Sequence, residues 1–298
     1  MPSDDAGPLV RHERRERTLL LTLDHPPVNV LSRDVLDALV ARLDEAERDL
    51  EVRAVVLASA AEKAFAAGAN IREMAPMGPD EARVHGARGQ AVTRRIERLP
   101  LPVIAAVHGV CLGGGCEIAT ACDFVIASED AQFGQPEINL GVIPGWGGSR
   151  RLPRRIGATR ARRWIYLGRP VSALEAREAG LVDSVVPRSD LLASAIALAD
   201  ELARKPPLAL AAAKAAVLNA TDPAIDEGLD FERDLWARLF GTEDQREGMA
   251  AFLEKRTSAP RSRAGWESAS RGFPWEAPAS GASPETRKKH KSGSSGSG

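Results

Sequence analysis

The chain has 298 residues, of which 44% are hydrophobic and 27% are charged. This length suffices for one large domain or two smaller ones, and the apolar fraction can fill a sizeable core. The formal net charge is −1, so there is no basic excess of the kind that favours nucleic acid, and we expect no nucleic-acid partner.

The first half of the chain alternates strand-like and helix-like patterns. Thr18 to Leu23 is a short β-prone run that a Pro-Pro pair ends. Ser32 is a suitable N-cap for a helix with apolar residues at helical spacing, and Arg53 to Ser59 has the composition of a buried strand. The helix–strand order returns twice, at Glu81–Glu97 with Val103–Val107 and at Ile118–Ala121 with Phe124–Ala127. This alternation predicts an α/β fold of βαβ units, with a largely parallel sheet buried on both faces.

The C-terminal part is predicted to be mostly helical, with one strand at Leu181 to Val186 and a helix break near Gly241. From residue 258 on, Ser, Gly, Pro, Arg and Lys dominate, which is typical of a flexible linker. We therefore expect an N-terminal extension (1–17), a core (18–190), a helical region (191–257) and a flexible tail (258–298). The expected helices are Leu152–Gly168, Ala173–Gly180, Asp190–Lys205, Pro207–Ala220 and Pro223–Glu254.

The three cysteines, Cys111, Cys116 and Cys122, are predicted to be buried and unpaired. Their odd number argues against a disulfide framework, and their spacing matches no zinc motif. The longest nearly uncharged run, Val103 to Cys122, contains three consecutive glycines and Glu117, which a membrane helix would not place at its centre. The N-terminus lacks the apolar segment of a signal peptide. We therefore predict a cytoplasmic protein that does not associate with membranes.

The first candidate site is the segment Val103 to Ala121, with the sequence VIAAVHGVCLGGGCEIATA. We expect an apolar strand to end near His108, a glycine-rich turn to follow, and a helix to begin near Gly115. Glycines let a ligand approach bare N–H groups, and a helix N-terminus can stabilise an anion or an oxyanion. Glu117 lies in the first helical turn, where it is either catalytic or a complement to the helix dipole.

The second candidate site is the segment Gln132 to Gly148, with the sequence QFGQPEINLGVIPGWGG. Its density of Gly and Pro predicts a shaped loop rather than a helix. Glu137 is its only charged residue. A lone carboxylate in an apolar loop is costly to bury without a task or a partner. Glu137 is therefore either functional or a structural acceptor of backbone hydrogen bonds.

Other chemistries lack their sequence motifs. There is no P-loop and no G-x-S-x-G elbow. The glycine-rich turn is not G-x-G-x-x-G, because Ile118 takes the place of the last glycine. The five histidines have no metal-ligand spacing, so no metal site is predicted.

Together the two candidate segments resemble the signature of the enoyl-CoA hydratase/isomerase (crotonase) family. The similarity runs from about Thr18 to Arg256 and also rests on KAFAAGANIREM, from Lys63 to Met74, and on GTEDQREGMAAFLEKR near the C-terminus. The resemblance implies a crotonase-like spiral of ββα units, followed by a helical C-terminal trimerisation region. It further implies a homo-oligomer, either a trimer or a dimer of trimers, that acts on an acyl-CoA substrate.

The resemblance also implies the site residues. Family hydratases carry two catalytic glutamates, which fall here on Glu117 and Glu137, while many relatives with other reactions have lost one of them. The oxyanion hole of the family uses two backbone N–H groups. The corresponding residues here are Ala69 and Gly114, and the CoA-binding residues are Ala69, Asn70, Ile71, Arg72 and Gly114. Coenzyme A is part of the substrate, so no separate cofactor is implied.

The chemistry of hydration agrees with these assignments. Adding water to an unsaturated thioester moves electron density onto the thioester oxygen, where N–H donors and a helix dipole stabilise it. We assign Glu117 as the base that takes a proton from water, and Glu137 as the acid that delivers one to C2. The prediction is an enoyl-CoA hydratase, a lyase of fatty acid metabolism, that adds water syn to a trans-2-enoyl-CoA and forms a 3-hydroxyacyl-CoA.

Three residues depart from the pattern of the family. Asn70 stands where Asp is usual, Arg150 stands where Gln is common, and Trp146 is a bulky residue in the loop that lines the acyl end of the site. These departures leave open a hydratase for a branched or aromatic acyl-CoA. A Δ3,Δ2-enoyl-CoA isomerase is another alternative, although it needs only one group to shuttle a proton. A non-catalytic CoA-binding or RNA-binding member is disfavoured, because both carboxylates are retained.

Overall fold

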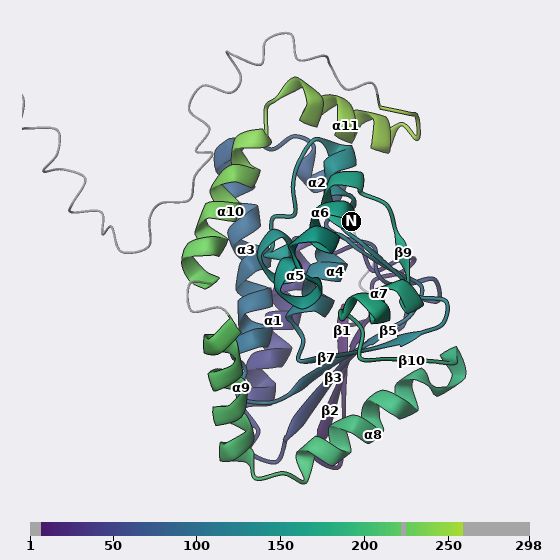
Figure 1. The fold of residues 1–298 in the computed structure, drawn as a ribbon, viewed down its shortest axis with the longest axis vertical. Helices are drawn as coiled ribbons and strands as arrows, with labels where there is room; N and C mark the ends of the chain where they lie inside the picture. The colour runs from purple at the N-terminus through teal and green to yellow at the C-terminus, as the bar shows by residue number, and fades with distance from the viewer. Residues whose placement is uncertain (1–6, 222–224, 259–298) are drawn as a thin grey trace, which may run out of the picture.

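The computed structural model describes residues 7–221 and 225–258. It contains two mixed sheets, surrounded by helices (Figure 1). The larger sheet has the order β1-β2-β3-β5-β7-β10, with strands β1 (Val10–Arg15), β2 (Thr18–Leu23), β3 (Ala54–Ser59), β5 (Val103–Val107), β7 (Phe124–Ser128) and β10 (Ser184–Val186). The smaller sheet has the order β4-β6-β8-β9, with strands β4 (Ala64–Ala66), β6 (Val110–Leu112), β8 (Gln132–Gly134) and β9 (Val171–Ser172).

The chain winds as a spiral in which each turn adds one strand to each sheet. β3 is followed by β4, β5 by β6, and β7 by β8, and the strands of successive turns are parallel within both sheets. This is the ββα repeat that the family resemblance implies. The simpler βαβ interpretation missed the second sheet, because β4, β6 and β8 have only three residues each, too few to show a hydrophobic period.

The strand β1 adds an antiparallel edge to the larger sheet by pairing with β2. It lies within residues 1–17, which the sequence indicated as an extension, because its alternating charged residues do not resemble a buried strand. Five of its six residues are exposed, as expected for an edge strand that carries charges and so resists further pairing.

The helices follow the sequence signals at their ends. The Ser32 hydroxyl accepts a hydrogen bond from the Val35 N–H at the start of α1. Gly157 divides the helix predicted from Leu152 to Gly168 into two, and the break predicted near Gly241 is confirmed. The helices are α1 (Arg33–Arg48), α2 (Ile71–Met74), α3 (Pro79–Arg98), α4 (Gly114–Ala121), α5 (Gly148–Ile156), α6 (Ala158–Leu167), α7 (Ala173–Ala179), α8 (Leu191–Ala203), α9 (Pro207–Thr221), α10 (Ile225–Leu239) and α11 (Glu243–Leu253), with short 3-10 helices η1 (Pro136–Leu140) and η2 (Arg188–Asp190).

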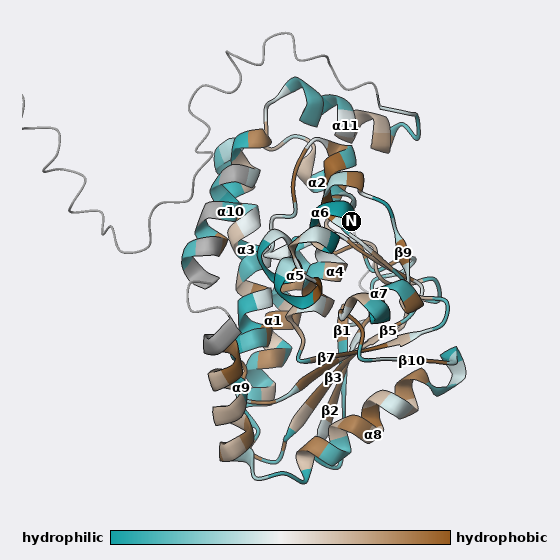
Figure 2. Cartoon of the chain, in the orientation of Figure 1, coloured by the Kyte–Doolittle hydropathy of each residue, from teal (hydrophilic) through white to brown (hydrophobic). Residues whose placement is uncertain are grey.

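The larger sheet is buried on both faces, as predicted. Leu20, Val56 and Ile104 point to one face and pack with α8, which appears brown in the hydropathy view (Figure 2). Their neighbours in sequence point to the other face, where Leu21 and Val55 pack with α1, α3 and the second sheet. Because adjacent strand residues point to opposite faces, uninterrupted runs such as TLLLTL are needed to bury both.

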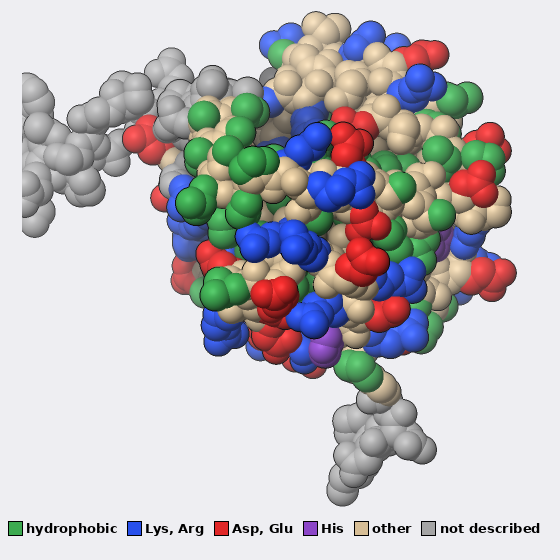
Figure 3. Space-filling model, turned by 90° about the horizontal axis from the view of Figure 1, so that it is seen from below, with side chains coloured by type: hydrophobic (Ala, Val, Ile, Leu, Met, Phe, Trp, Pro, Cys, Tyr) green, Lys and Arg blue, Asp and Glu red, His purple; other side chains and the backbone are tan. Residues whose placement is uncertain are grey.

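The surface carries interspersed charges. Lys and Arg side chains alternate with Asp and Glu side chains on the face shown in Figure 3, as the near-zero net charge suggests. Among the described residues, no helix is long and apolar enough to cross a membrane. The three cysteines are buried and free, which confirms the prediction made for them. The tail beyond residue 258 lies outside the described residues.

Asn29 connects strand ends of both sheets. It is fully buried and has a φ of +51°, a conformation that Asn tolerates better than most residues. Its side-chain oxygen accepts a hydrogen bond from the His25 N–H at 2.7 Å. Its amide nitrogen lies 2.7 Å from Ser59 Oγ and 3.0 Å from the Phe65 carbonyl. One side chain thus joins the turn after β2 to the end of β3 and to β4.

We expect Asn29→Ala to lower the free energy of unfolding by about 3 kcal/mol, because it leaves several buried polar groups without their hydrogen-bond partners. Asn139→Ala is a suitable control, since the exposed Asn139 makes one hydrogen bond, to the Gly168 carbonyl at 3.0 Å. Denaturant unfolding of both variants tests the prediction. Equal stability of the two variants would show that Asn29 does not hold the sheets together.

Candidate active site

The N-terminus of α4 forms the centre of the candidate site. The turn predicted before this helix contains the short strand β6, and the chain then bends at Gly113, whose φ is +51°. Gly114 and Gly115 follow as the first helical residues. A Cβ on Gly114 would lie 2.3 Å from the Trp146 ring, and one on Gly115 would lie 2.3 Å from the Ala66 carbonyl oxygen. Close packing therefore requires glycine at both positions.

Two backbone N–H groups are open beside this helix end. Among the described residues, neither the Ala69 nor the Gly114 N–H donates a hydrogen bond to the chain. Ala69 forms a parallel bridge with Leu31 through the flanking Gly68 carbonyl, which leaves its own N–H directed away from that bridge. A Cβ on Gly68 would lie 3.8 Å from the Gly114 nitrogen. The two segments with open donors therefore lie side by side.

Glu117 lies in the first turn of α4 and is 2% exposed. Its Oε1 accepts hydrogen bonds from the Trp146 N–H at 2.8 Å and from the Gly148 N–H at 2.7 Å. Burial raises the pKa of Glu117 well above its usual range, and the charges of Glu137 and Glu232 add to the rise, while the two N–H donors oppose it. Glu117 does more than complement the helix dipole, because it is tied to a distant loop.

Glu137 lies on η1, which the sequence interpretation missed when it predicted a loop throughout Gln132 to Gly148. A Cβ on Gly113 would lie 3.0 Å from Glu137 Oε1, so this carboxylate faces the turn before α4. Burial raises the pKa of Glu137 to about 8. The buried Gln135, with its amide nitrogen turned toward Glu137, lies 3.1 and 3.2 Å from the two carboxylate oxygens. Sequence reasoning did not single out Gln135.

A third buried carboxylate, Glu232 of α10, also reaches this region. It accepts hydrogen bonds from the Gly147 N–H at 2.6 Å, from the Ser149 N–H at 2.9 Å and from the Ser149 hydroxyl. Burial raises its pKa, although the nearby Arg151 opposes the rise. Sequence reasoning missed Glu232, because it is one of several charges on an amphipathic helix and looks like part of a solvated face.

The residues that depart from the family pattern have structural partners. Trp146 is 2% exposed, and its ring packs against Gly89 of α3 and Gly114 of α4. The Trp146 ring thus packs between α3 and α4, next to Gly114, whose N–H group is open. Asn70 caps α2, where its side chain accepts from the Arg72 N–H at 3.1 Å and donates to Glu73 at 2.9 Å. The predicted CoA-binding segment from Ala69 to Arg72 is partly to fully exposed.

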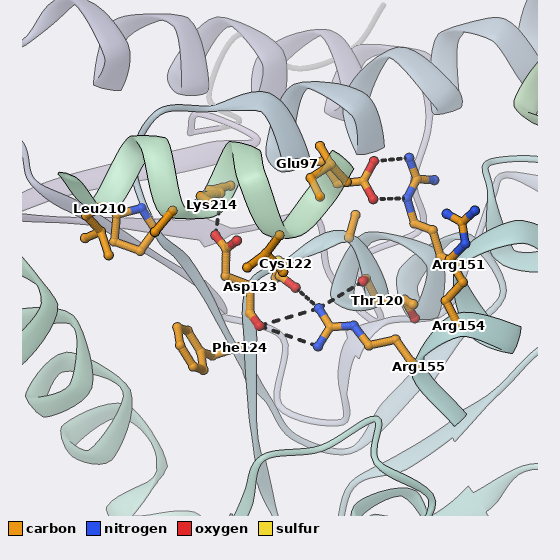
Figure 4. Close-up of a pocket in the computed structure, with 15 residues that line it drawn as sticks. Glu97, Thr120, Cys122, Asp123, Phe124, Arg151, Arg154, Arg155, Leu210 and Lys214 are labelled. Atoms are coloured by element: carbon orange, nitrogen blue, oxygen red, sulfur yellow. Dashed lines mark hydrogen bonds and ion pairs between the residues drawn. The ribbon is translucent and has the colours of Figure 1, made fainter. Parts of the chain in front are cut away.

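A cavity of about 460 Å³ lies at the opposite end of α4, away from these carboxylates (Figure 4). Residues from the end of α4, from α5 and from α9 line it. Charged side chains of the cavity interact with other groups of the chain. Lys214 forms an ion pair with Asp123 at 2.7 Å, and Arg155 donates a hydrogen bond to the Cys122 carbonyl beyond the last turn of α4. This cavity is separate from the candidate active site. Within residues 7–221 and 225–258, no group of three or more His, Cys, Asp or Glu residues could hold a metal ion.

Comparison with known proteins identifies the family. A family model described as enoyl-CoA hydratase/isomerase matches residues 13–261. The chain belongs to this family. The short-chain-enoyl-CoA hydratase of Clostridium acetobutylicum is 43% identical over 245 residues, covering 82% of this chain and 94% of that protein. The 2,3-dehydroadipyl-CoA hydratase of Escherichia coli is also 43% identical over 245 residues, covering 82% of this chain and 95% of that protein.

A solved member of the enoyl-CoA hydratase/isomerase family has the same fold. The enoyl-CoA hydratase from Bacillus anthracis is 39% identical, superposes with a TM-score of 0.70, and covers 85% of this chain and 98% of that one. The resemblance seen in the sequence is thereby confirmed, as is the crotonase fold. In the present chain, the fold brings Glu117, Glu137 and Gly114 together, while Ala69 approaches from the segment before α2.

The raised pKa of Glu137 predicts a pH-dependent cost to stability. A carboxyl group whose pKa is raised on folding binds its proton more tightly in the folded state. The contribution of Glu137 to stability is therefore greatest below its ordinary pKa of 4.5 and is lost as the pH rises to about 8. We expect Glu137→Gln to remove part of this decline, so that the variant melts several degrees above wild type at the alkaline end of the window.

Thermal melts below, within and above this window test the expectation. Glu129→Gln is the matched control, because Glu129 is exposed and its replacement should leave the melting profile unchanged. A Glu137→Gln profile parallel to that of wild type at every pH would contradict a raised pKa for Glu137.

Proposed function

We propose that this chain is an enoyl-CoA hydratase, which adds water syn to a trans-2-enoyl-CoA and forms a 3-hydroxyacyl-CoA. One observation carries the proposal: two carboxylates, the buried Glu117 and the half-buried Glu137, interact beside the open N–H groups of Ala69 and Gly114. The names of relatives at 43% identity support the same reaction. The two carboxylates favour hydration over Δ3,Δ2 isomerisation, since isomerisation needs only one proton-shuttling group.

The open N–H groups provide the electrostatic part of the reaction. When water attacks C3, electron density moves through C2 to the thioester oxygen. The Ala69 and Gly114 N–H groups would donate to this oxygen, and the N-terminal dipole of α4 adds to the stabilisation. The donors are already in place, so the protein does not have to reorganise as the charge develops. The CoA portion would lie along Ala69, Asn70, Ile71 and Arg72.

The two glutamates divide the proton transfers. The Trp146 and Gly148 N–H groups oppose the rise in the pKa of Glu117 that burial causes, and we assign Glu117 as the base that takes a proton from the attacking water. Glu137 has a pKa of about 8 and holds a proton at neutral pH, so it acts as the acid that delivers a proton to C2. In this proposal both glutamates act on the same face of the substrate double bond, which accounts for syn addition. No cofactor beyond the CoA of the substrate takes part.

The substrate proposal extends to enoyl-CoA thioesters as a class. Two relatives with the same identity to this chain are named for different acyl groups, one short-chain and one a dehydroadipyl group. The first test is therefore the loss of the conjugated thioester absorbance when the protein is mixed with crotonyl-CoA. A dehydroadipyl-CoA substrate in a parallel assay distinguishes between these two acyl types.

We also propose that the chain forms a homo-oligomer, a trimer or a dimer of trimers. Helix α9 supports this proposal, since Leu208 and Val217 are 85% and 63% exposed. Together with exposed alanines at 209, 212, 213, 215 and 216 they make much of the helix surface apolar, and extended exposed apolar surface favours association. Gel filtration with light scattering measures the assembly. The cytoplasmic location inferred from the sequence stays a prediction.

We expect Glu117→Ala and Glu137→Ala each to lower the hydration rate about 10²-fold to 10⁴-fold, the usual contribution of a general acid or base. The double variant should be little worse than the worse single variant, because groups that act as one unit are non-additive. Each variant should still bind a CoA thioester through the Ala69–Arg72 segment.

Hydration and 3-enoyl-CoA isomerisation should be measured side by side for wild type, both variants and the control Glu129→Ala. The control should match wild type. If the wild-type protein isomerises much faster than it hydrates, and only one glutamate affects the rate, the proposed function changes from hydratase to isomerase.

A further inference from the structure

Four consecutive backbone N–H groups, from Trp146 to Ser149, are shared alternately by two carboxylates. The Trp146 and Gly148 N–H groups donate to Glu117 at 2.8 and 2.7 Å. The Gly147 and Ser149 N–H groups donate to Glu232 at 2.6 and 2.9 Å. The segment thus lies between Glu117 of α4 and Glu232 of α10, and each carboxylate takes every second donor.

This alternation makes the two carboxylates depend on each other. Neighbouring N–H groups in the segment point to opposite sides, so a rotation that breaks the bonds to Glu232 also turns the donors away from Glu117. A hydrogen bond from an N–H group to an ionised carboxylate is stronger than one between neutral groups. The orientation of Glu117 is therefore determined partly by a residue that does not touch it.

Other contacts of this segment involve its carbonyl groups and leave its N–H groups to the two acids. The Trp146 carbonyl accepts from Thr93 Oγ1 at 2.8 Å and from Arg151 at 3.0 Å. Arg151 is itself held by Glu97 in a two-bond ion pair, which Figure 4 shows. These contacts anchor one end of the segment, while Glu232 anchors the residues that face Glu117.

We propose that Glu232 is a positioning residue, which orients Glu117 through the segment Trp146–Ser149. The proposal rests on the proposed function, since it is for the hydration reaction that Glu117 is oriented. Helix α10 then contributes to the reaction without touching the substrate. Packing alone does not call for an acid at this position, because an amide or apolar side chain would fill the same space. An acid here has a cost, since its charge raises the pKa of Glu117. The two backbone N–H groups that it binds, of Gly147 and Ser149, account for its presence.

The first test compares Glu232→Gln with wild type. We expect kcat for crotonyl-CoA to fall about 10-fold to 100-fold, the usual effect of displacing a catalytic group by a fraction of an ångström to an ångström. KM should change little, because the CoA-binding residues lie elsewhere. Asp234→Asn is the matched control on the same helix, since Asp234 is half exposed and pairs with Arg83. The control should keep wild-type kcat, whereas a kcat for Glu232→Gln equal to that of the control would overturn the proposal.

A double-mutant cycle separates positioning from a general loss of structure. If Glu232 acts through Glu117, then adding Glu232→Gln to Glu117→Gln should lower the residual rate no more than about threefold, because groups acting as a unit are non-additive. If Glu232 only stabilises the fold, the full loss should appear in both backgrounds. That additive result would refute the positioning role.

Hydrogen–deuterium exchange provides a measurement that is independent of activity. In Glu232→Gln, peptides that span residues 144–149 should exchange faster than in wild type or Asp234→Asn, and unchanged exchange would overturn the proposal. Should Glu232→Gln not fold, Ser149→Ala removes only the hydroxyl contact to Glu232 and should show the same pattern with smaller changes. A wild-type protein that does not hydrate enoyl-CoA refutes the proposed function, while faster exchange in Glu232→Gln would still support the positioning.

Discussion

The candidate site depends on how one short segment of backbone is held between two buried acids. The segment Trp146–Ser149 has four N–H groups that cannot all face one partner, and Glu117 and Glu232 divide them. This arrangement connects the central helix α4 to α10 in the C-terminal region. It also explains why Gly147 and Gly148 are glycines, since a Cβ on Gly148 would lie 2.9 Å from Glu117 Oε1, and Gly147 has a φ of +108°.

Three carboxylates in one region, the buried Glu117 and Glu232 and the half-buried Glu137, carry a cost to stability that the backbone only partly offsets. Each has a pKa raised by burial, and backbone N–H groups oppose the rise, two of them for Glu117, two for Glu232 and one for Glu137. The proposed reaction would account for this cost, because in it one acid holds a proton near neutral pH while another accepts one. Glu137 has one such backbone bond where the other two acids have two each, which is consistent with the proposal that it donates the proton. The spiral of strands around α4 provides the rigid frame that keeps these acids together.

The parts of the site that could be predicted were those with a local anomaly. Glu137 was visible as the one charge in a long apolar loop, and Glu117 as a charge after three glycines. Gln135 and Glu232 showed no such anomaly, because a polar residue beside a proline or on a charged helix is ordinary. Trp146 was noticed for its size. Its place, between α3 and α4 and directly behind Gly114, follows from the packing of distant segments.

The sequence by itself determined the local elements and the family. Runs such as TLLLTL and AVVLAS required strands buried on both faces, Ser32 and Gly241 marked helix ends, and the glycine-rich segments identified the family. Tertiary structure decided which groups meet. Glu117 bonds to a residue 29 positions away and Glu232 to one 85 positions away, and the second sheet is built from strands of two or three residues. Contacts over such distances leave no periodic trace in the sequence, because they arise from the path of the whole chain and not from the conformation of any one segment.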